Sequence, residues 1–184
     1  MPGRTLLSVL LLLSSSCAVW CATLCNNRCC SFLEGFPARL KVLRENYSNI
    51  REYYEANDDL DLVLIDQSIV ESFKTPFACH VMDGILKLYL DSVLPRALAS
   101  VTVETRDLQP HVESIQQILD QLKTEVNNCK HFFACKNQFD MNTLTSAYTQ
   151  QMQEKGLFKA MGELDLLFNY IEMYMSSKTH RNKA

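Results

Sequence analysis

Residues that interrupt helices and strands are scarce in this sequence of 184 residues, which has five glycines and five prolines. This scarcity leaves little room for long linkers or low-complexity segments, and we find no internal repeat. The chain also lacks a basic excess, since 18 Lys and Arg residues stand against 21 Asp and Glu, for a net charge of −3. The charge balance therefore favours neither nucleic acid nor an anionic membrane as a partner.

The first residues have the composition of a secretory signal peptide. Arg4 supplies a positive charge, and the apolar run Leu6–Leu13 is too short to span a membrane. Small residues follow, and cleavage after Ala18 or after Ala22 fits the pattern. We expect residues 1–22 to be a signal peptide, cleaved between 18 and 22, and residues 23–184 to form a single secreted domain without membrane insertion.

Six cysteines remain if cleavage follows Ala22, and an oxidising compartment favours disulfides between them. They are Cys25, Cys29, Cys30, Cys79, Cys129 and Cys135. Six cysteines allow 15 pairings, and the residues alone do not choose among them. Cys129, His131 and Cys135 have a loosely zinc-like spacing, but disulfides are the better interpretation, so we expect no metal.

No catalytic pattern is apparent. The sequence has four histidines, and none of them stands in a Ser/His/Asp or Cys/His arrangement: His80, His111, His131 and His180. We therefore expect no enzyme activity and no cofactor.

Apolar residues recur every three or four positions in most of the chain, which predicts helices. Cys25–Gly35 is expected to be irregular, and Pro37 to open the first helix. Further helices are expected at about 62–73, 77–99, 107–129 and 141–151, with Pro95 kinking or ending the third and Asp107 capping the fourth. With a last helix over 155–178 and no credible strand, the pattern predicts an all-α, six-helix bundle.

The last helix carries the strongest apolar stripe, formed by Leu157, Met161, Leu164, Phe168, Ile171 and Met175. The first helix has an equivalent stripe, formed by Leu40, Leu43, Tyr47, Ile50 and Tyr54. Both stripes require a core built by other segments, because large apolar side chains are stabilised by about 1.5–3 kcal/mol each when buried. Beside them run polar stripes with the same spacing, which by default are solvated faces. They are formed by Lys41, Arg44, Ser48, Arg51 and Glu55 on the first helix, and by Lys159, Gly162, Asp165 and Glu172 on the last.

Several short sequence motifs resemble those of a known protein family. They include E-K-G at 154–156, K-A-M at 159–161, E-x-D at 163–165 and N-Y-I-E-x-Y-M at 169–175, together with C-x-x-F-x-x-C at 129–135 and D-x-L-D at 58–61. Over about residues 29–177 the chain resembles the interleukin-10 family of class II helical cytokines. The resemblance implies a cytokine bundle that forms an intertwined homodimer, in which the last two helices pack into the partner.

The resemblance also implies a disulfide pattern. It gives Cys29–Cys129, or Cys30–Cys129 if the register slips by one residue, and Cys79–Cys135. Cys25 and Cys30 are additional and could form a local Cys25–Cys30 bridge.

The implied function is that of an extracellular signal. Family members cluster a high-affinity alpha and a low-affinity beta interleukin-10 receptor chain, which triggers JAK-STAT signalling and suppresses inflammatory responses. The alpha chain contacts the first helix, the loop after it and the last helix. On this sequence the matching positions are Lys41, Arg44, Arg51, Glu55, Asp61, Lys159, Gly162, Asp165 and Glu172.

Two further features of the sequence remain open. Asn46-Tyr47-Ser48 is an N-x-S sequon, which makes Asn46 a candidate for glycosylation. An alternative function is a secreted, disulfide-stapled helical carrier of a small apolar ligand. The bulky residues of the stripes argue against that alternative, since a carrier needs a roomy interior.

Overall fold

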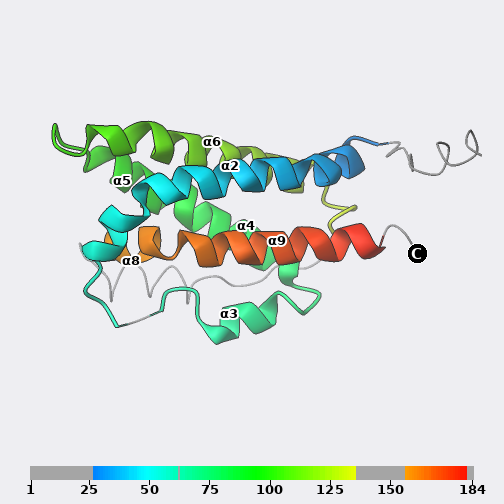
Figure 1. The fold of residues 1–184 in the computed structure, drawn as a ribbon. Helices are drawn as coiled ribbons and strands as arrows, with labels where there is room; N and C mark the ends of the chain where they lie inside the picture. The colour runs from blue at the N-terminus through cyan, green and yellow to red at the C-terminus, as the bar shows by residue number, and fades with distance from the viewer. Residues whose placement is uncertain (1–26, 62, 136–155, 182–184) are drawn as a thin grey trace, which may run out of the picture.

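The computed structural model describes residues 27–61, 63–135 and 156–181. The signal peptide, Cys25, Leu62 and the expected helix at 141–151 lie outside these residues. The described residues are helices joined by turns, in agreement with the all-α prediction (Figure 1). None of the described helices is long and apolar enough to cross a membrane.

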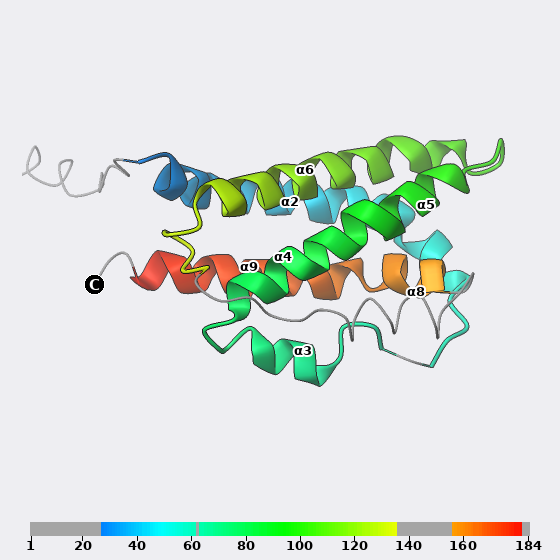
Figure 2. The ribbon, with the colours of Figure 1, turned by 180° about the vertical axis from the view of Figure 1, so that it is seen from behind.

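The first helix, α2 (Arg28–Ala56), is the centre of the bundle, because α6, α8 and α9 all pack against it. Its predicted apolar stripe from Leu40 to Tyr54 is buried. Figure 1 shows α6 on one side of α2 and α9 on the other, and Figure 2 shows α4 and α5 from behind.

The start of α2 was predicted wrongly. The helix begins at Arg28, where the Asn27 side chain accepts a hydrogen bond from the Cys30 amide at 2.9 Å, and Pro37 lies inside it. A proline inside a helix removes one backbone hydrogen bond. That loss is offset by packing, since the apolar spacing continues upstream of the proline through three buried residues, Phe32, Leu33 and Phe36.

The next elements are α3 (Gln67–Ser72), α4 (Ala78–Leu88), the π-helix η2 (Tyr89–Val93) and α5 (Leu94–Ala99). The last three form one continuous helical path, so Pro95 does not end it at Leu94. The Leu94 amide donates to the Tyr89 carbonyl five residues earlier, and this widened turn immediately precedes the proline. The wider hydrogen bonding accommodates Pro95 within a helix whose inner face is buried.

The short η3 (Arg106–Leu108) leads into α6 (Gln109–Asn128). Asp107 does not cap this helix: Leu108 occupies the N-cap position and makes no side-chain capping bond. The apolar residues of α6 recur every three or four positions and are buried: Val112, Ile115, Leu119, Leu122 and Val126.

The last predicted helix is divided into α8 (Gly156–Gly162) and α9 (Leu164–Arg181). All six residues of its apolar stripe, from Leu157 to Met175, are nonetheless buried. Side chains of other elements contact the chain just before Glu163. Two tyrosine hydroxyls donate hydrogen bonds to backbone carbonyls of this segment. Tyr89 donates to the Ala160 carbonyl at 2.9 Å, and Tyr47 donates to the Gly162 carbonyl at 2.6 Å.

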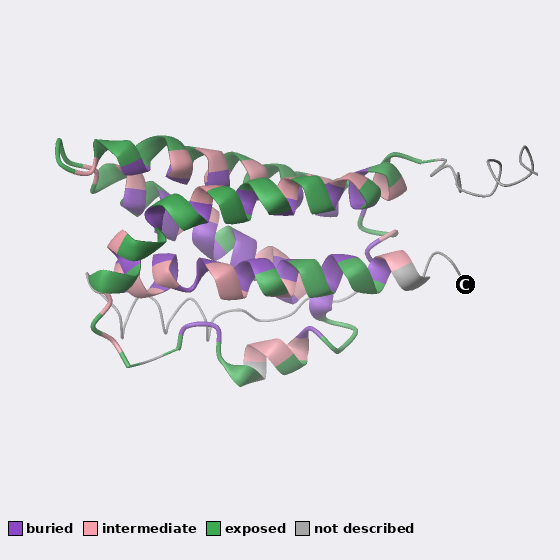
Figure 3. Cartoon of the chain, in the orientation of Figure 1, coloured by how far each residue is buried: buried purple, intermediate pink, exposed green. Residues whose placement is uncertain are grey.

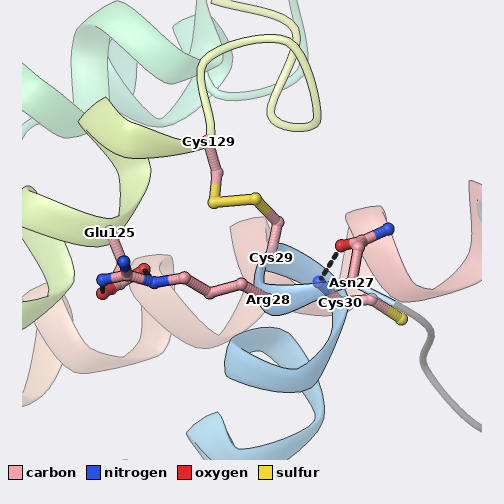
Figure 4. Close-up of a disulfide and its surroundings, with 6 residues drawn as sticks. All are labelled: Asn27, Arg28, Cys29, Cys30, Glu125 and Cys129. Carbon is pink, nitrogen blue, oxygen red and sulfur yellow. Dashed lines mark hydrogen bonds and ion pairs between the residues drawn. A yellow bond between two sulfur atoms is a disulfide. The ribbon is translucent and has the colours of Figure 1, made fainter.

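Disulfides tie the start of α2 and the start of α4 to the segment after α6. Cys29–Cys129 and Cys79–Cys135 are formed, with Cα–Cα distances of 5.8 and 5.2 Å, as the resemblance implied. Beside the first bridge, Arg28 pairs with Glu125 (Figure 4). The alternative Cys30–Cys129 pairing is wrong, because Cys129 bonds Cys29. Cys30 is itself disulfide-bonded, and its proposed partner Cys25 lies outside the described residues.

Candidate functional site

Two of the predicted site residues, 128 residues apart in the chain, meet across α2 and α9. An Arg44 guanidinium nitrogen donates to a Glu172 carboxylate oxygen at 2.7 Å and to the Asn169 side-chain oxygen at 3.0 Å. The Arg44 and Glu172 side chains remain 45% and 49% exposed. Figure 3 shows exposed turns of both helices on the same side of the molecule. The two polar stripes therefore form one accessible face.

The same face continues along α2. Arg51 Nε donates to Glu55 Oε1 at 2.7 Å, and both side chains are exposed. The Glu55 carboxylate raises the pKa of Arg51, so this guanidinium stays charged. Lys41 is exposed at the other end of the stripe, with its ammonium 3.6 Å from Glu45. Three cationic side chains of the stripe, at positions 41, 44 and 51, thus each pair with one carboxylate at the surface.

Two open depressions follow this stripe, with volumes of about 400 and 440 Å³. Arg44, Ser48 and Glu172 contribute to the first, and Ser48, Arg51 and Glu55 to the second. Because Ser48 borders both, the two depressions adjoin each other along α2, and both are open to solvent. Such a surface suits a folded partner better than it suits a small apolar ligand, which requires an enclosed apolar pocket.

Gly162 and Asp165 lie next to this face, on either side of the break between α8 and α9, and both are half-buried. The Gly162 carbonyl accepts the Tyr47 hydroxyl, and burial raises the pKa of that tyrosine, so it remains a proton donor. A Cβ on Gly162 would lie 3.8 Å from Glu55 Cγ, which is an ordinary contact. The close approach of α8 to α2 therefore does not require glycine.

Lys159 and Asp61 behave differently, although both were predicted for the same site. The Lys159 side chain is only 12% exposed, and its ammonium lies 2.7 Å from Asp58 Oδ2. Asp61 is exposed in the segment between α2 and α3. The structure thus covers Lys159 with the beginning of that segment, whereas helical spacing placed it on an open face.

A buried carboxylate that sequence reasoning did not select lies at the helix break. Glu163 is 8% exposed, and its carboxylate accepts hydrogen bonds from the backbone amides of Leu64 and Ile65 at 3.0–3.2 Å. Burial raises the pKa of Glu163, against the lowering effect of these two amides and of Lys159. The only signal in the sequence for this carboxylate was the pair Gly162-Glu163 inside a helical pattern. That pair does not indicate that Glu163 binds the amides of Leu64 and Ile65.

Asn46, the candidate glycosylation site, lies between α2 and α6. Its side-chain nitrogen donates to the Val42 carbonyl at 2.9 Å and to Ser114 Oγ at 3.0 Å, while its oxygen lies 2.9 Å from His111 Nδ1. The atom that would carry a glycan is thus engaged between helices in the folded chain. Glycosylation of Asn46 stays a prediction, and it would require these contacts to be lost.

A helical bundle tied by disulfides, with a charged face assembled from its first and last helices, has the architecture of a helical cytokine. Within the described parts of the chain, no group of three or more His, Cys, Asp or Glu side chains is placed to hold a metal ion.

Comparisons with known proteins identify the family. The family model described as Interleukin 10 matches residues 5–177. Interleukin-10 from Gallus gallus is 33% identical over 173 residues, covering 94% of this chain and 96% of that protein. Interleukin-10 from Felis catus is 31% identical over 157 residues, covering 85% of this chain and 86% of that protein. The chain belongs to the interleukin-10 family.

Proposed function

We propose that the protein is a secreted signal that binds cell-surface class II cytokine receptors with the face formed by α2, α8 and α9. The receptors are the alpha and beta interleukin-10 receptor chains, and their clustering activates JAK-STAT signalling and suppresses inflammatory responses. No bond is made or broken by the cytokine itself. Its activity depends on shape and charge complementarity at the interface.

The observation that carries this proposal is the contact of Arg44 with Glu172 and Asn169 across two helices. The contact holds side chains from distant parts of the chain in one arrangement before any partner binds. Ordering flexible side chains during association costs about 0.5–1.5 kcal/mol each, so prior ordering favours binding. An arginine that keeps part of its guanidinium accessible can also pair with a receptor carboxylate through two hydrogen bonds.

The proposed active form is an intertwined homodimer. The apolar stripe of α8 and α9 needs the surface of α2, and the same contacts are satisfied if α8 and α9 come from a second copy. They would be exchanged together with the predicted helix at 141–151. A dimer would present two receptor-binding faces and so bring two receptor complexes together. Native mass spectrometry should give twice the mass of the mature chain. Inserting several flexible residues in 136–140 should convert the dimer into a folded monomer, and an unchanged dimer would contradict helix exchange.

Receptor binding is tested with single substitutions on the face. Arg44→Ala and Glu172→Ala should each weaken binding to the ectodomain of the alpha receptor chain by about 1 kcal/mol or more, which is roughly fivefold. Asp120→Ala, at an exposed position of α6, is the matched control and should bind like the wild type. Surface plasmon resonance measures all three, and wild-type affinity in both face variants would refute this assignment of the face.

A further inference from the structure

The segment 57–66 connects α2 to α3 and contains Asp61; its described residues, 57–61 and 63–66, have no helical structure of their own. A segment with no internal ladder of hydrogen bonds keeps a fixed shape only if other elements hold it. In this protein two ionic side chains of the α8–α9 region contact it, the largely covered Lys159 near its beginning and the buried Glu163 near its end.

The first anchor is the ion pair between Asp58 and Lys159. The two side chains are 16% and 12% exposed, and the charged atoms are 2.7 Å apart. Asp58 also accepts a hydrogen bond from the Leu60 amide at 3.2 Å, which turns the chain at the point where it leaves α2. Removing one member of a well-covered pair leaves the other charge poorly solvated, so the pair constrains both segments.

The second anchor is the Glu163 carboxylate. It accepts from Leu64 and Ile65, whose residues are 3% and 2% exposed. Within the described residues, the structure gives these two amides no other acceptor. Two backbone amides converging on one carboxylate form charge-assisted hydrogen bonds, which are stronger than neutral ones.

Exposed residues lie between the anchors. Asp61 is accessible, and Val63 is 56% exposed although it is apolar. Asp58 before them is ion-paired, and Leu64 and Ile65 after them are buried, so the anchors restrict where these two side chains stand relative to α8.

We propose that Lys159 and Glu163 are positioning residues, which hold the segment 58–65 against the α8–α9 junction and thereby present Asp61 to the receptor. The role of Asp61 rests on the proposed function, whereas the anchoring of the segment does not. On this assignment Lys159 belongs to the binding site because it orders the segment, and direct contact with the receptor is not required of it.

The test combines hydrogen exchange with a double-mutant cycle. In Glu163→Gln the side chain keeps its size but loses one acceptor and gains a donor that faces two amides. The amides of Leu64 and Ile65 should then exchange at least tenfold faster in the free protein, while the centre of α2 stays protected. Asp61→Asn should weaken binding to the alpha receptor ectodomain at least fivefold in the wild-type background, and less than twofold in the Glu163→Gln background.

Arg44→Ala is the matched control, because Arg44 contacts α9 and not the segment; it should cost the same affinity in both backgrounds. Additive effects of Asp61→Asn and Glu163→Gln, or unchanged exchange at Leu64 and Ile65, would overturn the positioning role. If Asp61→Asn binds like the wild type while the two amides exchange faster, the anchoring stands and the receptor role of Asp61 fails. Should Glu163→Gln not fold, Asp58→Asn at the other anchor is put through the same cycle, with the Leu60 amide as its exchange probe.

Discussion

At the end of the bundle where α2 begins, covalent bonds hold the irregular chain: Cys29–Cys129 and Cys79–Cys135 fasten the segment after α6. At the opposite end, where α2 finishes, the segment 57–66 is held by Glu163 and by the Asp58–Lys159 pair (Figure 1). The disulfides of the first end require an oxidising compartment and do not titrate. The second requires only that water be excluded, and it responds to protonation.

Stability and receptor recognition are expected to depend on different ends of the bundle. The end of the bundle with the two disulfides, called here the cysteine end, is at the other end of α2 from the segment that carries Asp61. The contacts of Glu163 and Lys159, called here the polar end, are made to that segment itself. A disulfide fixes two points of the backbone, but several hydrogen bonds can set the orientation of a short exposed segment. We therefore expect the cysteine end to dominate the free energy of unfolding and the polar end to dominate the shape of the face.

The largest effect on stability should come from the cysteine end. Replacing both Cys79 and Cys135 by serine should lower the free energy of unfolding by about 2–4 kcal/mol, because the bridge restricts the unfolded chain over a separation of 56 residues. Urea denaturation under non-oxidising and non-reducing conditions measures the loss. The variant should bind the receptor normally at low temperature, and an unchanged denaturation midpoint would show that the bridge adds nothing.

A smaller effect is expected from Glu163→Gln, which should lower the free energy of unfolding by about 1–3 kcal/mol at neutral pH because two buried amides lose part of their acceptor.

This loss of stability should depend on pH. Burial raises the pKa of Glu163 above 4.5, so the folded chain binds this proton more tightly than the unfolded chain. The wild type therefore gains stability relative to the variant as the pH falls from the raised pKa to 4.5, with no further change on either side of that window.

This pH dependence is measured by urea denaturation of both proteins between pH 7 and pH 4.5. A difference that widens towards acid supports the raised pKa. A difference that narrows would mean that the Leu64 and Ile65 amides outweigh burial and hold the pKa down.

The smallest effect on stability should come from the exposed face. Arg44→Ala should change the free energy of unfolding by less than about 1 kcal/mol, since ion pairs with about half of each side chain in water contribute little. The same substitution should weaken receptor binding clearly. Thermal unfolding at low and high salt measures the first quantity, and a large loss of stability would mean that Arg44 is a structural residue.

Much of the helical core was predictable, since the stripes of α2, α6 and α8–α9 are buried as their spacing indicated. The start of α2 was not predicted. Proline is common at the first position of a helix, which favoured a start at Pro37, but the apolar spacing at Phe32 and Phe36 extends further upstream. The division at Glu163 was not predicted from the spacing, and the hydroxyls that bond the chain just before it, those of Tyr47 and Tyr89, come from other elements.

The candidate site likewise was predictable only where helical spacing decides which residues share a face. Arg44 and Glu172 were placed on polar stripes by spacing, and the structure brings them into contact. Lys159 was placed on the same stripe as Glu172, yet it is covered by Asp58 from a segment that has no helical period. Helical spacing describes only the faces of one helix and carries no information about a loop that folds across it.

The sequence by itself determined that this chain is helical, which apolar side chains form the core and, through its resemblance to a known family, that Cys79 pairs with Cys135. These properties follow from local periodicity and from motifs, both of which can be read along the chain. Only the tertiary structure decided which polar groups are covered, that Glu163 holds the amides of Leu64 and Ile65, and that Lys159 faces Asp58. Those contacts join residues about 100 positions apart, and their strength comes from the exclusion of water by the assembled helices.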